Sequence, residues 1–112
     1  MVSAELFEEF EVHLGHRLGE LGYSKSAREI DGPFGSHYAQ FQNGVIAYRL
    51  LWDGRENWLA LERAAVAPDD PAKWRDISLQ RFPSLATPKD GVVAAFQAIC
   101  AALEREVNAA EP

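Results

Sequence analysis

Four side chains near the N-terminus have the residue types and the spacing that can hold a divalent metal ion on one side of a helix. They lie four, three and four residues apart: Glu9, His13, His16 and Glu20. Imidazole ligands would favour zinc. A helical projection, however, places this line almost opposite the apolar stripe of Leu14 and Leu18, so it faces solvent without the buried neighbours that orient metal-bound histidines. The sequence therefore favours weak surface pairs, and predicts no metal site and no cofactor.

No other group of residues has the spacing of a catalytic motif. His37 follows the segment DGPFGSH, and no Ser, Cys or Asp lies at a spacing that would make it a general base. That segment lacks the strand-to-helix context of a phosphate-binding loop, so we read it as a turn. Asp69, Asp70 and Asp76 lack the spacing of a calcium loop. Cys100 falls among apolar positions, where a thiol is usually inert. We predict no catalytic residue, and favour a protein that is not an enzyme.

The composition is that of one globular domain. The chain has 112 residues, 47% of them hydrophobic and 25% charged, so we predict a single domain over residues 1–112. A net charge of −6 disfavours nucleic acid and anionic membranes, because both attract clustered Lys and Arg. A single cysteine excludes an intramolecular disulfide and indicates a cytoplasmic location. We expect neither a secretory signal nor a membrane-spanning helix, which needs about 20 apolar residues.

Apolar spacings of three and four predict two amphipathic helices, one at each end of the chain. The first should run from about Ala4 to Leu21, with Ser3 as its N-cap and Gly22 as its stop. Gly15 and Gly19 inside it suggest close approach by the sheet or the second helix. The second should begin in the segment TPKDG. There Thr87 can serve as the N-cap, Pro88 takes the first helical position, and Asp90 completes a pattern like a capping box. Its apolar face comprises Val92, Val93, Phe96, Ile99, Cys100, Leu103 and Val107.

Between the helices the apolar pattern has period two, with turn signals at Asn43-Gly44 and Asp53-Gly54. We predict strands at about 36–42, 45–52, 57–66 and 76–82, with a weaker one near 27–30. The fold class is therefore α+β: an N-terminal helix, an antiparallel meander sheet of four to five strands, and a C-terminal helix. Both helices should cover one face of the sheet, because each must bury its apolar stripe.

Strand alternation assigns the side chains to two sheet faces. A two-residue turn at Asn43-Gly44 pairs Phe41 with Ile46, Ala39 with Tyr48 and His37 with Leu50. Together with Trp52, Leu59 and Leu61, these residues should face the helices. The other face then collects a mixed polar and aromatic set: Tyr38, Gln40, Gln42, Val45, Ala47, Arg49, Leu51, Trp58, Ala60 and Glu62.

Trp58 is thus the tryptophan expected to face away from the helices. Arg49 should lie near it, held either by an ion pair with Glu62 or by stacking over the Trp58 indole. One interpretation is a local cluster that only braces the sheet. The other is a recognition surface, since Trp, Tyr and Arg are enriched at binding hot spots.

The segment from Phe34 to Phe82 resembles small uncharacterised bacterial proteins, some of them akin to immunity proteins of toxin systems. The resemblance is carried by a hairpin-centred set and a later set: Arg49, Trp52, Asp53, Gly54, Glu56 and Trp58, then Trp74, Asp76 and Arg81. It covers about half the chain and implies cytoplasmic binding of a cognate protein.

These observations favour a non-catalytic protein-binding module that binds its partner through the sheet face left open by the helices. The predicted partner-binding residues are Tyr38, Gln40, Arg49, Leu51, Trp58 and Glu62. The acidic charge suits a basic partner. One alternative is a small-molecule-binding protein or enzyme with a pocket between sheet and helices near His37, Tyr48 and Trp52. A second alternative is a homodimer formed through the open sheet faces.

Overall fold

The computed structural model describes residues 2–66, 73–82 and 88–110, and has the α+β fold that the sequence predicts. Its elements follow in this order: α1 (Ala4–Glu20), β1 (Ser24–Glu29), the short 3₁₀ turn η1 (Pro33–Gly35), β2 (His37–Gln42), β3 (Ile46–Asp53), β4 (Trp58–Ala65), β5 (Arg75–Arg81) and α2 (Lys89–Ala110). The five strands form one antiparallel meander in the order β1-β2-β3-β4-β5.

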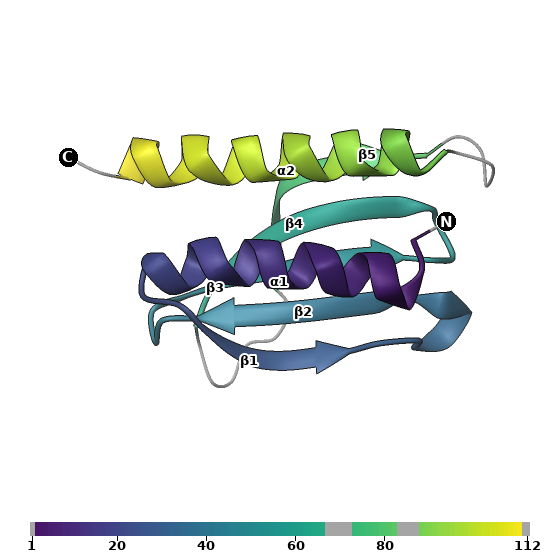
Figure 1. Cartoon of the computed structure of the whole chain (residues 1–112). Helices are drawn as coiled ribbons and strands as arrows, with labels where there is room; N and C mark the ends of the chain where they lie inside the picture. Colours follow the sequence, from purple (N-terminus) through teal and green to yellow (C-terminus); the bar gives the residue numbers. More distant parts are fainter. Residues whose placement is uncertain (1, 67–72, 83–87, 111–112) are drawn as a thin grey trace.

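Both helices lie across one face of this sheet and run in the same direction (Figure 1). The α1 helix packs on β1 and β2, and α2 packs on β4 and β5. The helices meet where the rings of Phe10 and Phe96 stack, with centroids 4.2 Å apart. The core fills the space between helices and sheet, and includes Leu50, Trp52 and Leu59, each at most 1% exposed.

The start and stop signals of α1 work as its sequence predicts. The Ser3 hydroxyl accepts a hydrogen bond from the Leu6 amide at 3.1 Å, which satisfies one of the free N–H groups of the first turn. Gly22 follows the helix with a φ of 91°, a conformation that a side chain disfavours. Close approach to the sheet is confirmed at Gly15, because a Cβ there would lie 3.1 Å from Cε1 of Phe41. It is wrong for Gly19, where a Cβ would meet nothing within 4 Å.

This difference predicts opposite outcomes for two alanine substitutions in one helix. Gly19→Ala should raise the free energy of unfolding by about 1 kcal/mol, since glycine inside a helix is worse than alanine by that amount. Gly15→Ala should gain less or be destabilising, because its methyl group presses on the buried Phe41 ring. Urea denaturation followed by circular dichroism measures both changes. Equal stabilisation by the two substitutions would contradict the close packing at Gly15.

The register of the β2–β3 hairpin differs by two residues from the predicted one. Phe41 faces Tyr48, not Ile46; correspondingly, Ala39 faces Leu50 and His37 faces Trp52. The turn residues are Gly44 and Val45 instead of Asn43 and Gly44, with Gly44 at a φ of 91°. The Asn43 side chain fixes this turn, because its Oδ1 accepts from the amides of Val45 and Ile46 at 2.9 and 2.8 Å. A shift of two residues preserves the face of every strand residue, but it removes Val45 from the sheet.

The β3–β4 connection is the four-residue form of the Asp53-Gly54 turn, so that Asp53 faces Trp58. The Asp53 carboxylate accepts from the amides of Arg55 and Glu56, both at 3.0 Å. Leu61 and Leu59 consequently face Leu50 and Trp52. The β1 strand begins at Ser24, earlier than predicted, and is mostly exposed. Its weak apolar alternation is typical of such an edge strand.

The α2 helix begins at Lys89, one residue after Pro88, and the Pro88 carbonyl accepts from the amides of Gly91 and Val92. The predicted cap Thr87 lies outside the described residues. Neither described helix is long and apolar enough to cross a membrane.

Candidate functional site

The sheet face opposite the helices presents rows of side chains that cross neighbouring strands. One row, Gln42, Ala47 and Ala64, lies nearest the β2–β3 turn. The other three rows are Gln40, Arg49, Glu62 and Asp76; Tyr38, Leu51, Ala60 and Leu79; and Asp53, Trp58 and Arg81. We call these three rows the open face. No helix in the described part of the chain covers it. Its middle row is the most apolar: Tyr38, Leu51 and Leu79 are half-buried there, and Ala60 is 2% exposed. Charged and aromatic side chains lie on both sides of this row.

Arg49 is held on the open face by two contacts. It faces Glu62 across the β3–β4 ladder, and its Nε donates to Glu62 Oε1 at 2.8 Å. Its guanidinium also lies over the ring of Trp74, 4.3 Å from the ring centroid. The side chains of Arg49 and Glu62 are only 26% and 14% exposed, so partial desolvation strengthens both contacts. Arg49 is therefore held by contacts on two sides and presents one side of a cation–indole stack.

A second arginine–tryptophan stack lies in the row that contains Trp58. The Arg81 guanidinium is 5.1 Å from the Trp58 ring centroid, and the two residues face each other across β4 and β5. Trp58 is half-buried, whereas Arg81 is exposed. The apolar middle row thus runs between two such stacks, one at Arg49 and one at Arg81.

The η1 turn adds an exposed aromatic side chain near the end of the sheet where Trp58 lies. Phe34 is 69% exposed and adopts a φ of 61°, which is unusual for a bulky residue. The Arg55 guanidinium lies 5.4 Å from its ring centroid. The Gly54 amide donates to the Ser36 hydroxyl at 2.9 Å, which joins η1 to the β3–β4 turn. A Cβ at Gly54 would collide with the Phe34 carbonyl, so this junction requires glycine.

The six predicted partner-binding residues all belong to the open face and lie in neighbouring rows: Tyr38, Gln40, Arg49, Leu51, Trp58 and Glu62. Of the two predicted ways to hold Arg49, the ion pair with Glu62 is present. The stack forms with Trp74, while Trp58 stacks with Arg81. Reasoning from strand faces missed Trp74, Leu79 and Arg81. Face alternation in β5 does not find Leu79 and Arg81, because a bulge between Leu61 and Glu62 shifts the pairing of β4 with β5, and Trp74 precedes that strand.

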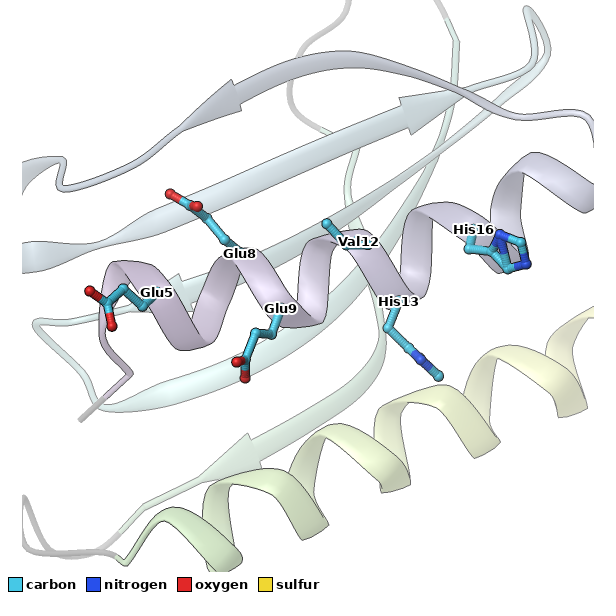
Figure 2. Close-up of a pocket in the computed structure, with 6 residues that line it drawn as sticks. All are labelled: Glu5, Glu8, Glu9, Val12, His13 and His16. Carbon is cyan, nitrogen blue, oxygen red and sulfur yellow. The ribbon is translucent and has the colours of Figure 1, made fainter.

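The line of glutamates and histidines on α1 is exposed, as its position opposite the apolar stripe predicts. Figure 2 shows this helix surface, where the side chains of His13 and His16 project from different turns. The His13 ring packs edge-on against Phe96 of α2, with centroids 5.8 Å apart. Among the described residues, no three His, Cys, Asp or Glu side chains are grouped so that they could hold a metal ion.

His37 is a buried histidine with both ring nitrogens in hydrogen bonds. Its Nδ1 accepts from the Asp31 amide and its Nε2 lies 3.0 Å from the Val2 carbonyl. Since a carbonyl oxygen only accepts, these contacts assign the proton of a neutral ring to Nε2. At 2% exposure, the ring connects the start of the chain to the turn before β2. This arrangement leaves no ring nitrogen for proton transfer to a substrate.

Glu11 is a buried carboxylate that sequence reasoning did not single out. It is 2% exposed and joins α1 to β1 through ion pairs with Lys25 at 2.5 Å and Arg28 at 3.0 Å. Burial acts to raise the pKa of Glu11, but the hydrogen bonds and positive charges of Arg28 and Lys25 outweigh it and lower the pKa. The carboxylate therefore stays ionised and serves as a connection between helix and sheet.

Cys100 lines a groove of about 250 Å³ between the two helices, together with His13 and Glu104. Burial, with a smaller contribution from Glu104, raises the pKa of the Cys100 thiol to about 11. The thiol is consequently protonated at neutral pH and is a poor nucleophile.

The three residues predicted to line a pocket are instead buried in the packed core. Trp52 is 1% exposed, His37 2% and Tyr48 3%. Trp52 packs against Phe82, with ring centroids 5.8 Å apart, and its indole N–H has no hydrogen-bond partner among the described residues. Of the three, Tyr48 lines a small cavity, at the opposite end of the sheet from His37 and Trp52.

Fold and site together define an α+β protein with a two-helix layer on one sheet face and an arginine–tryptophan surface on the other. Comparisons of the chain with protein-family models, curated proteins and solved structures found no match.

Proposed function

We propose that the protein is a non-catalytic binding module that recognises a protein partner through the open face. The observation that carries this proposal is the apolar row between two arginine–tryptophan stacks. Trp and Arg are the residues most enriched at interface hot spots, because they combine a large contact area with polar groups that fix orientation. Here the guanidinium groups are already positioned over the indoles, so binding would immobilise few additional side chains.

The charge of the chain favours a basic protein as the partner. The net charge is −6, and a complementary long-range field accelerates encounter and disfavours other acidic proteins. An immunity-like role in the cytoplasm, in which the module neutralises a cognate basic toxin, is the particular form that the sequence resemblance supports.

Two substitutions on the open face test this proposal. Trp58→Ala and Arg81→Ala should each weaken binding of the partner about 30-fold, the effect of losing a hot-spot side chain. The partner is captured from the native host with the wild-type chain, identified by mass spectrometry, and titrated as a purified protein by calorimetry. Arg49→Ala is less suitable, because it would leave the half-buried Glu62 without its cation.

Gln97→Ala is the matched control, since Gln97 is exposed on α2, away from the open face. It should bind the partner with wild-type affinity. Unchanged affinity of both open-face variants would overturn the proposal. The molar mass of the isolated chain, measured by light scattering, separates this proposal from the dimer alternative. A dimer that Trp58→Ala dissociates would show that a second copy occupies this face.

A further inference from the structure

A small cavity lies on the helix side of the sheet, beside the β2–β3 turn and the last turns of α2. Its volume is about 210 Å³. Its apolar wall consists of Leu21, Ile46 and Val107. Tyr23 and Tyr48 line it as well, with ring centroids 5.3 Å apart and planes tilted by 57°. The cavity is separate from the open face, because Tyr48 faces the helices.

Arg63 gives this cavity a polar end. Its Nη1 donates to Glu106 Oε1 at 3.2 Å, and Arg75 donates to the same oxygen at 2.8 Å. Two guanidinium groups thus share one carboxylate, so the local charge of these three groups is positive. Arg63 and Glu106 both line the cavity.

The Nε atom of Arg63 is buried and has no hydrogen-bond partner among the described residues. A buried N–H without an acceptor is uncommon in folded proteins, because its lost hydration is not replaced. With Nε unpaired and Glu106 shared with Arg75, the charge of Arg63 is only partly compensated, which favours an anion beside its guanidinium.

We infer that this cavity binds a small organic carboxylate with an apolar body. The carboxylate would lie against the guanidinium of Arg63, which lines the cavity, and the body would contact the tyrosine rings and the apolar wall. At about 30 Å³ for each water, the cavity has room for roughly seven waters, which corresponds to a ligand of about seven to ten non-hydrogen atoms. A monoanion suits the site better than a phosphate dianion, because Glu106 would repel the second charge.

Two ligands with the same ring test this inference on the full chain. Benzoate carries the carboxylate, and benzyl alcohol is its neutral counterpart. In an amide NMR titration to about 10 mM, benzoate should shift residues 43–48, 63 and 106–107 saturably, since small fragments bind weakly but specifically. Benzyl alcohol should bind at least about tenfold more weakly, because it lacks the charge-assisted hydrogen bond.

Two variants alter opposite ends of the cavity, so a folding failure in one leaves the other as a test. Arg63→Met removes the guanidinium while Arg75 still pairs with Glu106, and Val107→Trp fills the apolar end. Each should weaken benzoate binding at least about tenfold, whereas Arg105→Lys, at an exposed position of α2, should leave it unchanged. The inference is overturned if benzoate causes no saturable shift, if benzyl alcohol binds equally well, or if the folded cavity variants bind like wild type.

Discussion

Trp52→Ala is expected to lower the free energy of unfolding by about 3–5 kcal/mol, the cost of truncating a large aromatic side chain in a packed core. Trp52 is 1% exposed, faces His37 on β2 and Leu59 on β4, and packs against Phe82. Because a domain of this size is typically stable by about 5–15 kcal/mol, the variant should lie close to global unfolding. Thermal and urea denaturation, followed by circular dichroism, measure the loss.

Trp58→Ala provides the internal comparison, since it removes the same side chain from the open face. Trp58 is half-buried and contacts the exposed Arg81. A cation–indole contact of this kind contributes about 0.5–1 kcal/mol, so the total loss should be much smaller than for Trp52. If the two variants were equally unstable, Trp58 would be a structural residue, and its effect on partner binding would no longer report on recognition.

The sequence predicts which face each strand residue occupies more securely than it predicts the pairing between strands. Alternation places Tyr48, Leu50 and Trp52 under the helices, and a register shift of two residues leaves that assignment unchanged. The shift itself depends on the Asn43 side chain, which caps the amides of Val45 and Ile46. Glycine accepts a positive φ at either central position of a hairpin turn, so the pattern Asn-Gly alone leaves the register open.

The candidate site was predictable as a face but not as a set of contacts. Arg49 and Trp58 are two rows apart on the open face. Arg49 stacks with Trp74, just before β5, and Trp58 stacks with Arg81 at the end of β5. A bulge between Leu61 and Glu62 shifts the pairing of β4 with β5. Bulges are not encoded in apolar alternation, so these partners required the three-dimensional structure.

Ion pairs border the core where α1 meets β1, where α2 meets α1, and where α2 meets β4 and β5. Glu11 joins α1 to β1, and Glu104 joins α2 to α1 through a bidentate contact with Arg17 at 2.7 Å. Glu106 joins α2 to β4 and β5. Apolar burial holds the layers together, and these arginine–carboxylate contacts restrict how the helices slide across the sheet, because their geometry is directional. Glu11 is the most buried of the three carboxylates.

Glu11→Gln should therefore lower the free energy of unfolding at neutral pH by about 1–3 kcal/mol, the range for hydrogen bonds to a charged group. The loss stays below that of a fully buried ion pair because Lys25 and Arg28 are each 44% exposed and can be rehydrated. The pKa of Glu11 is lower in the folded chain than its usual value of 4.5. Its contribution to stability is thus fully present above pH 4.5 and disappears as the pH falls through the folded pKa.

Wild type and Glu11→Gln should accordingly differ most near pH 7 and converge in acid, as measured by urea denaturation at a series of pH values. Glu104→Gln is the control. The hydrogen bonds of Arg17 lower the pKa of Glu104 too, but its side chain is 41% exposed, so salt should screen its effect more strongly. A difference between wild type and Glu11→Gln that stays constant from pH 7 to acid would mean that Glu11 acts through packing alone. Convergence in acid would instead identify its charge as the connection between α1 and the edge of the sheet.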